Sequence, residues 1–276
     1  MTKIAIISDI HGNLTALNAV LKDIEKRGIN IIYCLGDIIA KGVHPSECLT
    51  LIKNKCQIIL KGNCDEILCS PFELTEGIER ERRIWNQSML SEEEKDYLLN
   101  LPYCHEFYMS GSLIRLFHAH PSKIDILISN LDSFENKREL FLPSENTLSS
   151  EIADIVIYGH THLSYLDKMY NRTIINVGSV GNQIDVVRNA KFDANTRETT
   201  QANYLIIEGN INSKSYDDSL SFQFIRVPYD FAKELSSEKI NIEREAYEKE
   251  LSEGKYRDTL KLIKSLKKRN INSNKF

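Results

Sequence analysis

The stretch KIAIISDIHGN, residues 3–13, joins an apolar run to a short segment of charged and polar side chains. Residues 3–8 carry mostly consecutive aliphatic side chains, which is typical of a strand buried on both faces. Residues 13–26 continue with leucine, valine and isoleucine at helical spacing. The sequence therefore predicts a strand, a tight turn that carries Asp9 and His11, and a helix.

Two further units repeat this order along the chain. Residues 31–35 and 56–60 read as the second and third strands, and residues 45–53 as a short helix that begins at a proline. Strands that alternate with helices pair in parallel through right-handed crossovers. We therefore expect an α/β fold that begins with a parallel sheet.

The pattern changes after residue 70. Residues 70–101 look helical, with a capping box from Ser91 to Glu94, and we expect them to form a cap insertion. Residues 132–150 are polar and predict a loop or a short helix. No linker divides the chain, so a single domain over residues 1–276 is expected, with a helical C-terminal extension over about residues 230–270. The other expected elements are strands at 105–109, 113–118, 154–158, 173–177, 203–208 and 222–227, and helices at 231–235, 242–251 and 255–266.

Polar side chains follow these strands at the point where each strand ends. The second strand runs into Gly36-Asp37, the third into Gly62-Asn63, and a later strand into the run Gly159-His160-Thr161-His162. In open α/β sheets, ligands bind outside the carboxyl ends of the strands. We therefore expect seven candidate ligands to converge at one edge: Asp9, His11, Asp37, Asn63, His118, His160 and His162.

These seven side chains suit divalent metal ions. One ion needs about three to six protein ligands, so the set fits two ions that share one bridging carboxylate. Imidazole mixed with carboxylate favours manganese, iron, zinc or nickel over calcium or magnesium. Each fragment alone is weak, because Gly-Asp and Gly-Asn pairs are common in turns. Their joint order is what favours a metal centre over a structural interpretation.

This order resembles the signature of the calcineurin-like metallophosphoesterase superfamily, which reads D-x-H, G-D, G-N, a lone H and then G-H-x-H. The resemblance covers about residues 1–230. The runs GNCD, residues 62–65, and NVGSVGN, residues 176–182, are similar to the small bacterial and archaeal phosphodiesterase branch, which includes bacterial asymmetric dinucleoside tetraphosphate hydrolases. The resemblance implies a four-layer α/β/β/α sandwich of two mixed sheets.

The resemblance also implies how the ligands divide between two divalent ions, of which manganese is the expected metal. Asp37 would bridge both ions, and a hydroxide held between them would attack phosphorus in line without a covalent intermediate. The candidate catalytic residues are Asp37, Asn63, His160, Cys64 and His120. The first ion would be held by Asp9, His11, Asp37 and His162, and the second by Asp37, Asn63, His118 and His160.

Cys64 departs from the pattern of the phosphoprotein phosphatases, which have a histidine at this position. A thiol is a poorer general acid for an alkoxide than imidazolium is, so we expect activity to favour good leaving groups. The alternative is that Cys64 only fills space at a strand end. His120 in the run HAHP is a candidate replacement, and the alternative for it is a surface-loop role.

The sequence predicts the substrate less sharply. A phosphodiester or a nucleotide polyphosphate is the first expectation; the alternatives are a phosphomonoester or phosphoprotein substrate, and a metal-binding scaffold with little catalysis. Trp85 and Tyr97 in the expected cap could stack on a nucleobase, but burial in the core is the more common role of such residues.

Composition limits the other partners. The 35 basic and 39 acidic residues give a net charge of −4, which offers no electrostatic reason to expect nucleic acid or a membrane surface as a partner. We expect no signal peptide or membrane-spanning run. The six cysteines form no CxxC pair, which favours reduced thiols and a cytoplasmic location. A small phosphate-ester substrate is therefore the expected partner, and the apolar stripe of the C-terminal helix is consistent with either a covered core or a homo-oligomer.

Overall fold

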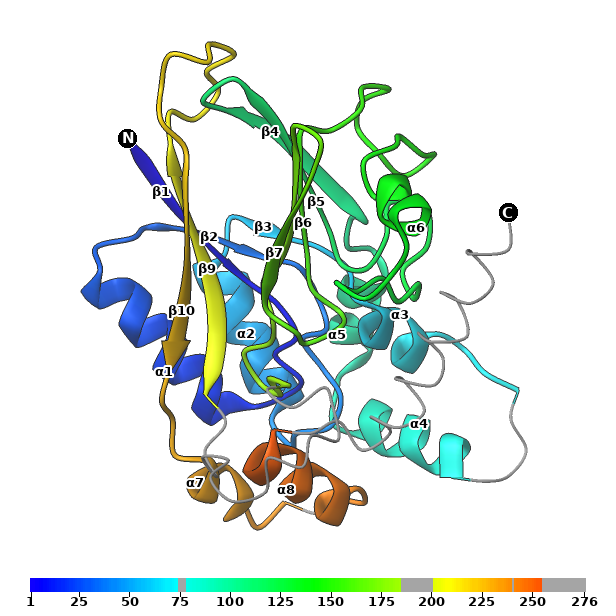
Figure 1. The fold of residues 1–276 in the computed structure, drawn as a ribbon. Coiled ribbons are helices and arrows are strands. Elements are labelled where there is room, and N and C mark those ends of the chain that lie inside the picture. The colour runs from blue at the N-terminus through cyan, green and yellow to red at the C-terminus, as the bar shows by residue number, and fades with distance from the viewer. Residues whose placement is uncertain (74–77, 185–200, 240, 255–276) are drawn as a thin grey trace.

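The computed structural model describes residues 1–73, 78–184, 201–239 and 241–254 (Figure 1). Two five-stranded sheets lie face to face, and both are mixed. Sheet A has the order β10-β9-β1-β2-β3, in which β1, β2 and β3 are parallel. Strand β9 pairs antiparallel with β1, and β10 pairs antiparallel with β9. Its strands are β1 (Thr2–Ile7), β2 (Ile31–Cys34), β3 (Ile58–Ile59), β9 (Ala202–Gly209) and β10 (Ser221–Val227).

Sheet B has the order β4-β5-β6-β8-β7. Its central strands β5, β6 and β8 are parallel, and the edge strands β4 and β7 pair antiparallel with their neighbours. Two mixed sheets confirm the predicted α/β sandwich. The strands are β4 (Cys104–Met109), β5 (Ser112–Phe117), β6 (Ile155–Tyr158), β7 (Tyr165–Met169) and β8 (Arg172–Asn176).

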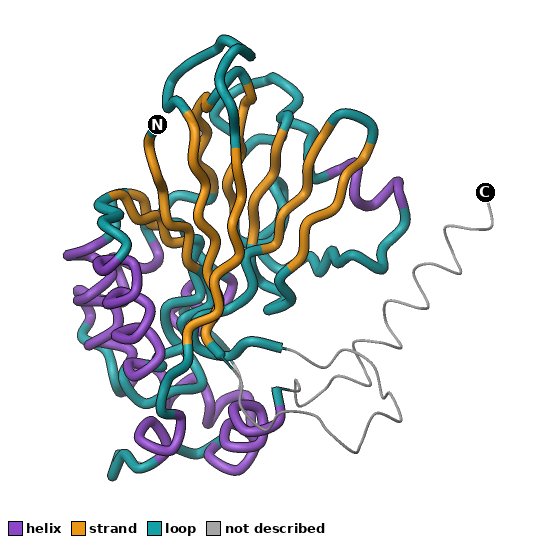
Figure 2. The backbone as a smooth tube through the Cα atoms, turned by 60° about the vertical axis from the view of Figure 1, so that its left-hand side comes forward, coloured by secondary structure: helices purple, strands orange, loops and turns teal. Residues whose placement is uncertain are grey.

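The alternation of side chains along β1 builds two of the three hydrophobic cores. Ile4 and Ile6 point between the sheets, where they pack with residues of β5 and β6. Ala5 and Ile7 point to the other face and pack beneath helices α1 (Leu14–Lys26) and α2 (Pro45–Lys55). Figure 2 shows these helices on one side of the strands. Because β1 is buried on both faces, its sequence is a continuous apolar run.

The third core covers the outer face of sheet B. Phe117, Val156 and Tyr158 pack there against Leu140 and Phe141. The only α-helix that the described residues place in this layer is α6 (Phe134–Glu139), within the segment predicted to be a loop or short helix. The outer layer on sheet B is therefore built mainly from loops.

Two helices, α4 (Ile78–Ser88) and α5 (Glu92–Leu99), lie within the predicted helical run over residues 70–101, and a further helix, α3 (Asn63–Cys69), precedes it. Helix α3 was not predicted; its first turn is stabilised by Asp65, whose carboxylate accepts a hydrogen bond from the Gly62 N–H. The capping box of α5 is confirmed, since the Ser91 hydroxyl accepts from the Glu94 N–H and the Glu94 carboxylate accepts from the Ser91 N–H.

The other differences are small. Strand β7 was not predicted, because its polar sequence YLDKM belongs to a half-exposed edge strand. Helix α7 (Phe231–Leu235) has the predicted bounds, and α8 (Arg244–Glu253) ends at Gly254 in the left-handed region. The predicted helix 255–266 lies outside the described residues.

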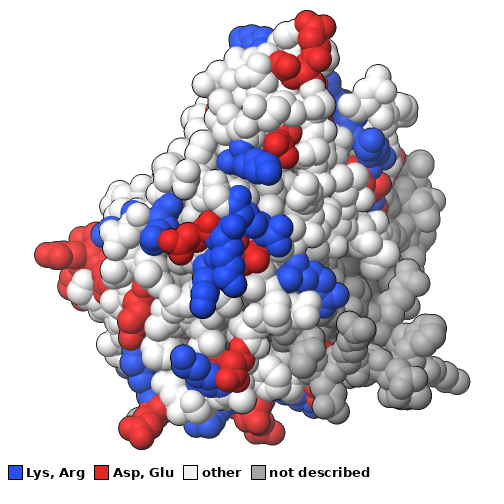
Figure 3. All heavy atoms as spheres, turned by 90° about the vertical axis from the view of Figure 1, so that its left-hand side faces the viewer, with Lys and Arg blue, Asp and Glu red and all other residues white. Residues whose placement is uncertain are grey.

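Within the part of the chain that the structure describes, no helix is long and apolar enough to cross a membrane. On the face shown in Figure 3, a group of basic side chains lies near the centre with acidic side chains beside it, and other charged side chains of both signs are scattered around it.

Candidate metal centre

All seven candidate ligands lie just beyond strand ends, but they come from both sheets. Asp9 and His11 follow β1 and Asp37 follows β2, whereas His118 follows β5 and His160 follows β6. Asn63 is the first residue of α3, and His162 lies two residues beyond His160. The sequence predicted convergence at the edge of one sheet. The structure brings the side chains together where the carboxyl ends of two facing sheets meet.

The backbone at five of these positions is left-handed: Asp9, His11, Asp37, His160 and His162 have φ between 51° and 66°. Such a conformation costs a non-glycine residue on the order of 1–3 kcal/mol, and it persists only where the surroundings enforce it. Five strained residues in one cluster therefore indicate a site whose side-chain directions matter more than local stability.

Backbone hydrogen bonds enforce the turn after β1. The Asp9 N–H donates to the Gly36 carbonyl at 3.0 Å, and the Asp37 carbonyl accepts from the N–H groups of Ile10 and His11 at 2.8 and 2.9 Å. The turns after β1 and β2 thus form one unit.

Two glycines allow the close approach of the remaining turns. A Cβ on Gly62 would lie 2.2 Å from Asp37 Oδ1, and one on Gly159 would lie 2.4 Å from Asp9 Oδ2. Contacts this short do not occur in folded proteins, so each of these carboxylates requires a glycine beside it.

Asp65 also builds the site, and sequence reasoning did not assign it a role. Its buried carboxylate accepts from the N–H groups of Ile38 and Gly62 at 2.9 and 3.0 Å, which ties the turn that carries Asp37 to the start of α3. Burial and the neighbouring Asp37 raise its pKa to about 7. The capping position three residues after Gly62 was the available signal.

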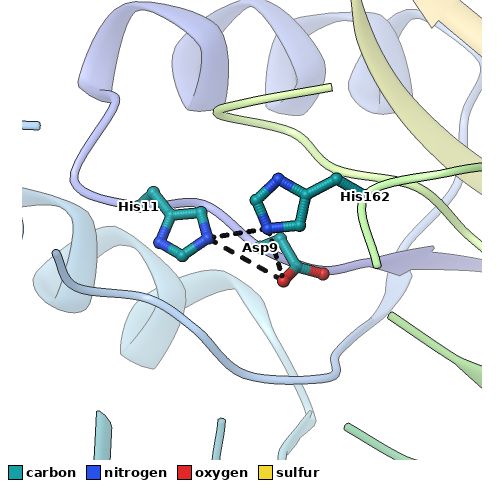
Figure 4. Close-up of side chains that lie close together, drawn as sticks. All are labelled: Asp9, His11 and His162. Atoms are coloured by element: carbon teal, nitrogen blue, oxygen red, sulfur yellow. Dashed lines mark hydrogen bonds and ion pairs between the residues drawn. The ribbon is translucent and has the colours of Figure 1, made fainter. Parts of the chain in front are cut away.

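Asp9, His11 and His162 form the first cluster (Figure 4). His162 Nε2 lies 3.2 Å from Asp9 Oδ1 and 3.0 Å from His11 Nε2. Burial opposes ionisation of Asp9, but His162 and the other histidines hold its pKa well below the usual range. Burial, with the positive charge of Lys41, lowers the pKa of His11. These three residues present ligand atoms within 4.8 Å of one another.

Asp37 connects this cluster to a second one. Its Oδ2 lies 3.7 Å from His11 Nε2, and its Oδ1 lies 3.5 Å from His118 Nε2. His118 Nε2 lies 3.0 Å from Asn63 Oδ1, and the rings of His118 and His160 meet edge to face at 5.1 Å. The carboxylate of Asp37 therefore faces both groups, as a bridging ligand must.

The hydrogen bonds of the histidines test whether the site suits a cation. The Nδ1 atoms of His11, His118 and His162 face the carbonyl oxygens of Ile39, Leu35 and Asn182 at 3.2, 3.0 and 2.6 Å. A carbonyl only accepts, so Nδ1 carries the proton and the Nε2 atom of a neutral ring presents a lone pair. In the neutral rings of His11 and His162, these lone pairs face each other across 3.0 Å. A cation between them turns this repulsion into coordination.

Two further observations agree with a cation. Burial lowers the pKa of His160 to about 3, and its buried Nε2 has no hydrogen-bond partner. Burial also lowers the pKa of His118, but the carboxylates of Asp37 and Asp9 outweigh it and raise that pKa, so positive charge is favoured there. The donor set therefore fits a divalent metal in a buried site of histidine and aspartate.

Cys64 lies within the site, whereas His120 contacts other residues. The Cys64 N–H donates to Asp37 Oδ1 at 2.8 Å, and its Sγ is within 4.8 Å of ligand atoms of His11 and Asp37. Burial and the Asp37 charge raise the pKa of this thiol well above its ordinary value. His120 is buried, its Nδ1 accepts from Ser122, and its Nε2 lies 3.8 Å from Glu139. Burial lowers its pKa.

The two aromatic residues considered for base stacking are Trp85 on α4 and Tyr97 on α5. Tyr97 packs against the core beneath sheet A, with the Lys53 ammonium 4.3 Å above its ring. Trp85 is half-buried on α4. The core interpretation therefore holds for Tyr97.

A recess of about 360 Å³ lies beside α3, the helix that begins with Asn63. Glu66 and Ile67 of α3 form one wall, and residues 122–125 form another, together with Tyr103 and Asn146. The recess therefore shares helix α3 with the candidate site, since Asn63 is the first residue of that helix.

Comparison with known proteins agrees with this geometry. Residues 2–196 match the model of the calcineurin-like phosphoesterase superfamily domain. The chain is 31% identical over 206 residues to the uncharacterized protein MJ0912 of Methanocaldococcus jannaschii, which covers 68% of this chain and 80% of that protein.

Two solved structures share the fold over nearly the whole chain. A metallophosphoesterase from Sphaerobacter thermophilus superposes with a TM-score of 0.66 at 25% identity, covering 92% of this chain and 100% of its own. The hypothetical protein PH1004 from Pyrococcus horikoshii OT3 has the same TM-score of 0.66 at 16% identity, covering 95% and 98%.

Proposed function

Because this chain belongs to the calcineurin-like phosphoesterase superfamily, we propose that it is a metal-dependent phosphodiesterase. Its substrate is a phosphodiester or a nucleotide polyphosphate. The observation that carries the proposal is the pair of ligand clusters joined by Asp37, in which histidine lone pairs face other acceptors.

Two divalent ions, with manganese as the expected metal, would supply Lewis-acid activation of water and neutralise phosphate charge. Asp37 is proposed to contact both ions, with its two oxygens turned toward the two clusters. The first ion would take Asp9, His11 and His162 as its other ligands, and the second would take Asn63, His118 and His160.

The residues of the chain then have separate tasks. The carbonyls of Ile39, Leu35 and Asn182 hold three imidazoles in the tautomer that presents Nε2. Asn63 and His160 are proposed to orient the phosphate.

Because position 64 holds a cysteine and not a histidine, the site is expected to favour phosphodiesters with good leaving groups over phosphoproteins. Its raised pKa keeps the thiol protonated at neutral pH, and a weakly acidic, weakly polar thiol gives little help to a departing alkoxide. A nitrophenoxide or a nucleotide phosphate leaves without that help. Cys64 is therefore proposed to line the site without assisting the reaction. The rate is then expected to depend on how readily the leaving group departs.

The recess supports a substrate larger than inorganic phosphate. Its volume of about 360 Å³ lies at the lower end of the range for small-molecule sites, about 300–1,000 Å³. His120 is proposed to hold the loop that contains Ser122, which lines the recess, and not to contact the reacting phosphate. All six cysteines are free thiols, which supports the proposal of a reducing, cytoplasmic location.

The test is hydrolysis of bis-p-nitrophenyl phosphate, p-nitrophenyl phosphate and diadenosine tetraphosphate by the manganese-loaded protein. Faster turnover of the diester or the dinucleotide than of the monoester is expected. Preference for the monoester would replace the proposal with a phosphomonoesterase. No turnover of any of the three with metal bound would favour a scaffold.

A further inference from the structure

Two backbone carbonyls orient the histidines of the first cluster, and they lie in different loops. The Ile39 carbonyl accepts from His11 Nδ1, and Ile39 belongs to the loop after β2. The Asn182 carbonyl accepts from His162 Nδ1, and Asn182 belongs to the loop after β8. The direction of both Nε2 atoms therefore depends on how these loops are held relative to each other.

One carboxylate oxygen of the C-terminal region contacts both loops. Glu250 lies on α8, at the bottom of the molecule in Figure 1, and only 1% of the residue is exposed. Its Oε2 accepts from Asn182 Nδ2 at 2.8 Å and lies 3.4 Å from Lys41 Nζ. Lys41 is two residues beyond Ile39. The same oxygen thus ties the loop after β2 to the loop after β8.

Neighbouring contacts make this connection more rigid. The Asn182 N–H donates to the Ser179 hydroxyl, which in turn donates to the Asp9 carbonyl at 2.7 Å. The side chain of Asn241, three residues before α8 begins, donates to the Lys41 carbonyl at 2.8 Å. Lys41 itself has a left-handed backbone, with φ of 63°, which requires such support.

We propose that Glu250 is a positioning residue for the first metal cluster: it fixes the two loops whose carbonyls orient His11 and His162. This inference rests on the proposed metal-dependent function. It extends that function beyond residues 2–196, the part that matches the family model, because α8 follows that part in the chain. The affinity of the first cluster for its metal then depends on a helix outside the matched region.

The expected loss of metal affinity can be estimated from other residues that hold metal ligands in place. Their loss costs about 10–100-fold in metal affinity. Glu250→Leu removes both the charge and the acceptor for Asn182, so an increase in the manganese dissociation constant of that order is expected. Glu250→Gln keeps an acceptor oxygen and should recover part of the affinity.

The matched control is Glu234 on α7. It is also a buried glutamate of the C-terminal region, 3% exposed, but its Oε2 accepts from the N–H and hydroxyl of Thr15 on α1. Glu234→Gln and Glu234→Leu alter the packing of the same region without touching the loops that orient the histidines.

The experiment is calorimetric titration of manganese into chelator-treated protein, with thermal unfolding of the metal-free samples and the visible absorption of the cobalt-loaded forms. We expect weaker manganese binding and an altered cobalt spectrum for Glu250→Leu, partial recovery for Glu250→Gln, and wild-type manganese affinity and cobalt spectra for both Glu234 variants. Equal affinity in the folded Glu250 variants and the wild type would overturn the inference and leave the proposed function intact. A wild-type protein that binds no metal would overturn both.

Discussion

The Nε2 atoms of His11 and His162 lie 3.0 Å apart, although both rings direct Nδ1 at a backbone carbonyl. When both rings are neutral, two lone pairs at this distance repel each other, and Asp9 Oδ1 adds a third acceptor 3.2 Å from His162 Nε2. Folding brings these groups together against their electrostatic preference. A site of this kind is stable when a cation supplies the missing positive charge.

Replacement of Asp37 by asparagine tests the bridging role. The variant keeps the shape but loses the negative charge shared by the two clusters, so both should bind metal more weakly. We expect hydrolysis to fall by more than about 100-fold, since even residues that only support a ligand cost about 10–100-fold. Steady-state kinetics and metal analysis of the purified variant measure both effects.

Asp167→Asn is the matched control for this substitution. Asp167 lies on edge strand β7 and pairs with Lys137 at 2.7 Å, and the exposed fraction of its side chain is 37%. Its loss should leave hydrolysis unchanged. A full metal load and rate in Asp37→Asn would rule out the bridging assignment.

Gly62→Ala tests whether the site needs the close approach of α3. The added methyl group would lie 2.0 Å from the Asp37 nitrogen, although the φ of Gly62, −95°, suits any residue. Overpacking of this kind costs about 1–3 kcal/mol or more, and relief of the clash must displace Asp37. Urea unfolding should show the loss of stability, and calorimetry should show the loss of manganese binding.

Gly28→Ala provides the comparison. Gly28 has φ of +67°, but a Cβ there would meet nothing within 4 Å. Its strain of about 1–2 kcal/mol should lower stability without changing metal affinity. Equal manganese affinity in Gly62→Ala and Gly28→Ala would show that the approach of α3 is not needed for binding.

Substitutions of Cys64 test the preference for good leaving groups. Cys64→His introduces an imidazole that can assist a departing alkoxide, a contribution worth about 100-fold or more where it operates. We expect a gain with alkyl phosphodiesters and little change with bis-p-nitrophenyl phosphate. Cys64→Ala should alter neither substrate by more than a few-fold. A large loss with the nitrophenyl diester in Cys64→Ala would give the thiol a direct catalytic part.

The buried carboxyl group of Glu234 should make the stability of the protein depend on pH. Burial raises its pKa, and the hydrogen bonds from Thr15 only partly oppose this. Because the folded-state pKa lies above the unfolded one, its contribution is fully present below the ordinary glutamate pKa of about 4.3. It is lost as the pH rises through the raised value.

Glu234→Gln has no titrating group at position 234. The stability of this variant relative to the wild type should therefore increase as the pH rises from about 4 toward neutrality. Urea denaturation of the metal-free proteins at several pH values measures the difference. A gap that stays constant with pH would contradict the raised pKa.

The pattern of strands and helices was sufficient to predict the parallel start of the α/β fold and the convergence of the seven candidate ligands, and the family resemblance supplied the sandwich of two mixed sheets. Strand β1 is buried on both faces, so its apolar run is unambiguous, and the ligands follow strand ends at fixed positions. Asp9 and His11 follow directly from that pattern.

The supporting residues could not be predicted in the same way. Asp65 acts through backbone N–H groups 26 and 27 residues away, and Glu250 contacts Asn182 across 68 residues. No local periodicity encodes such contacts. Strand β7 was missed because an edge strand with half-exposed residues gives only a weak apolar signal.

The most direct test of the account is anomalous diffraction at the manganese edge from crystals grown with manganese. The account predicts two peaks per chain, about 3.5–4 Å apart, one on each side of the Asp37 carboxylate. The peak near His162 should also contact Asp9 and His11, and the other should contact Asn63, His118 and His160. Manganese bound elsewhere, or none at these side chains in a fully folded protein, would contradict it.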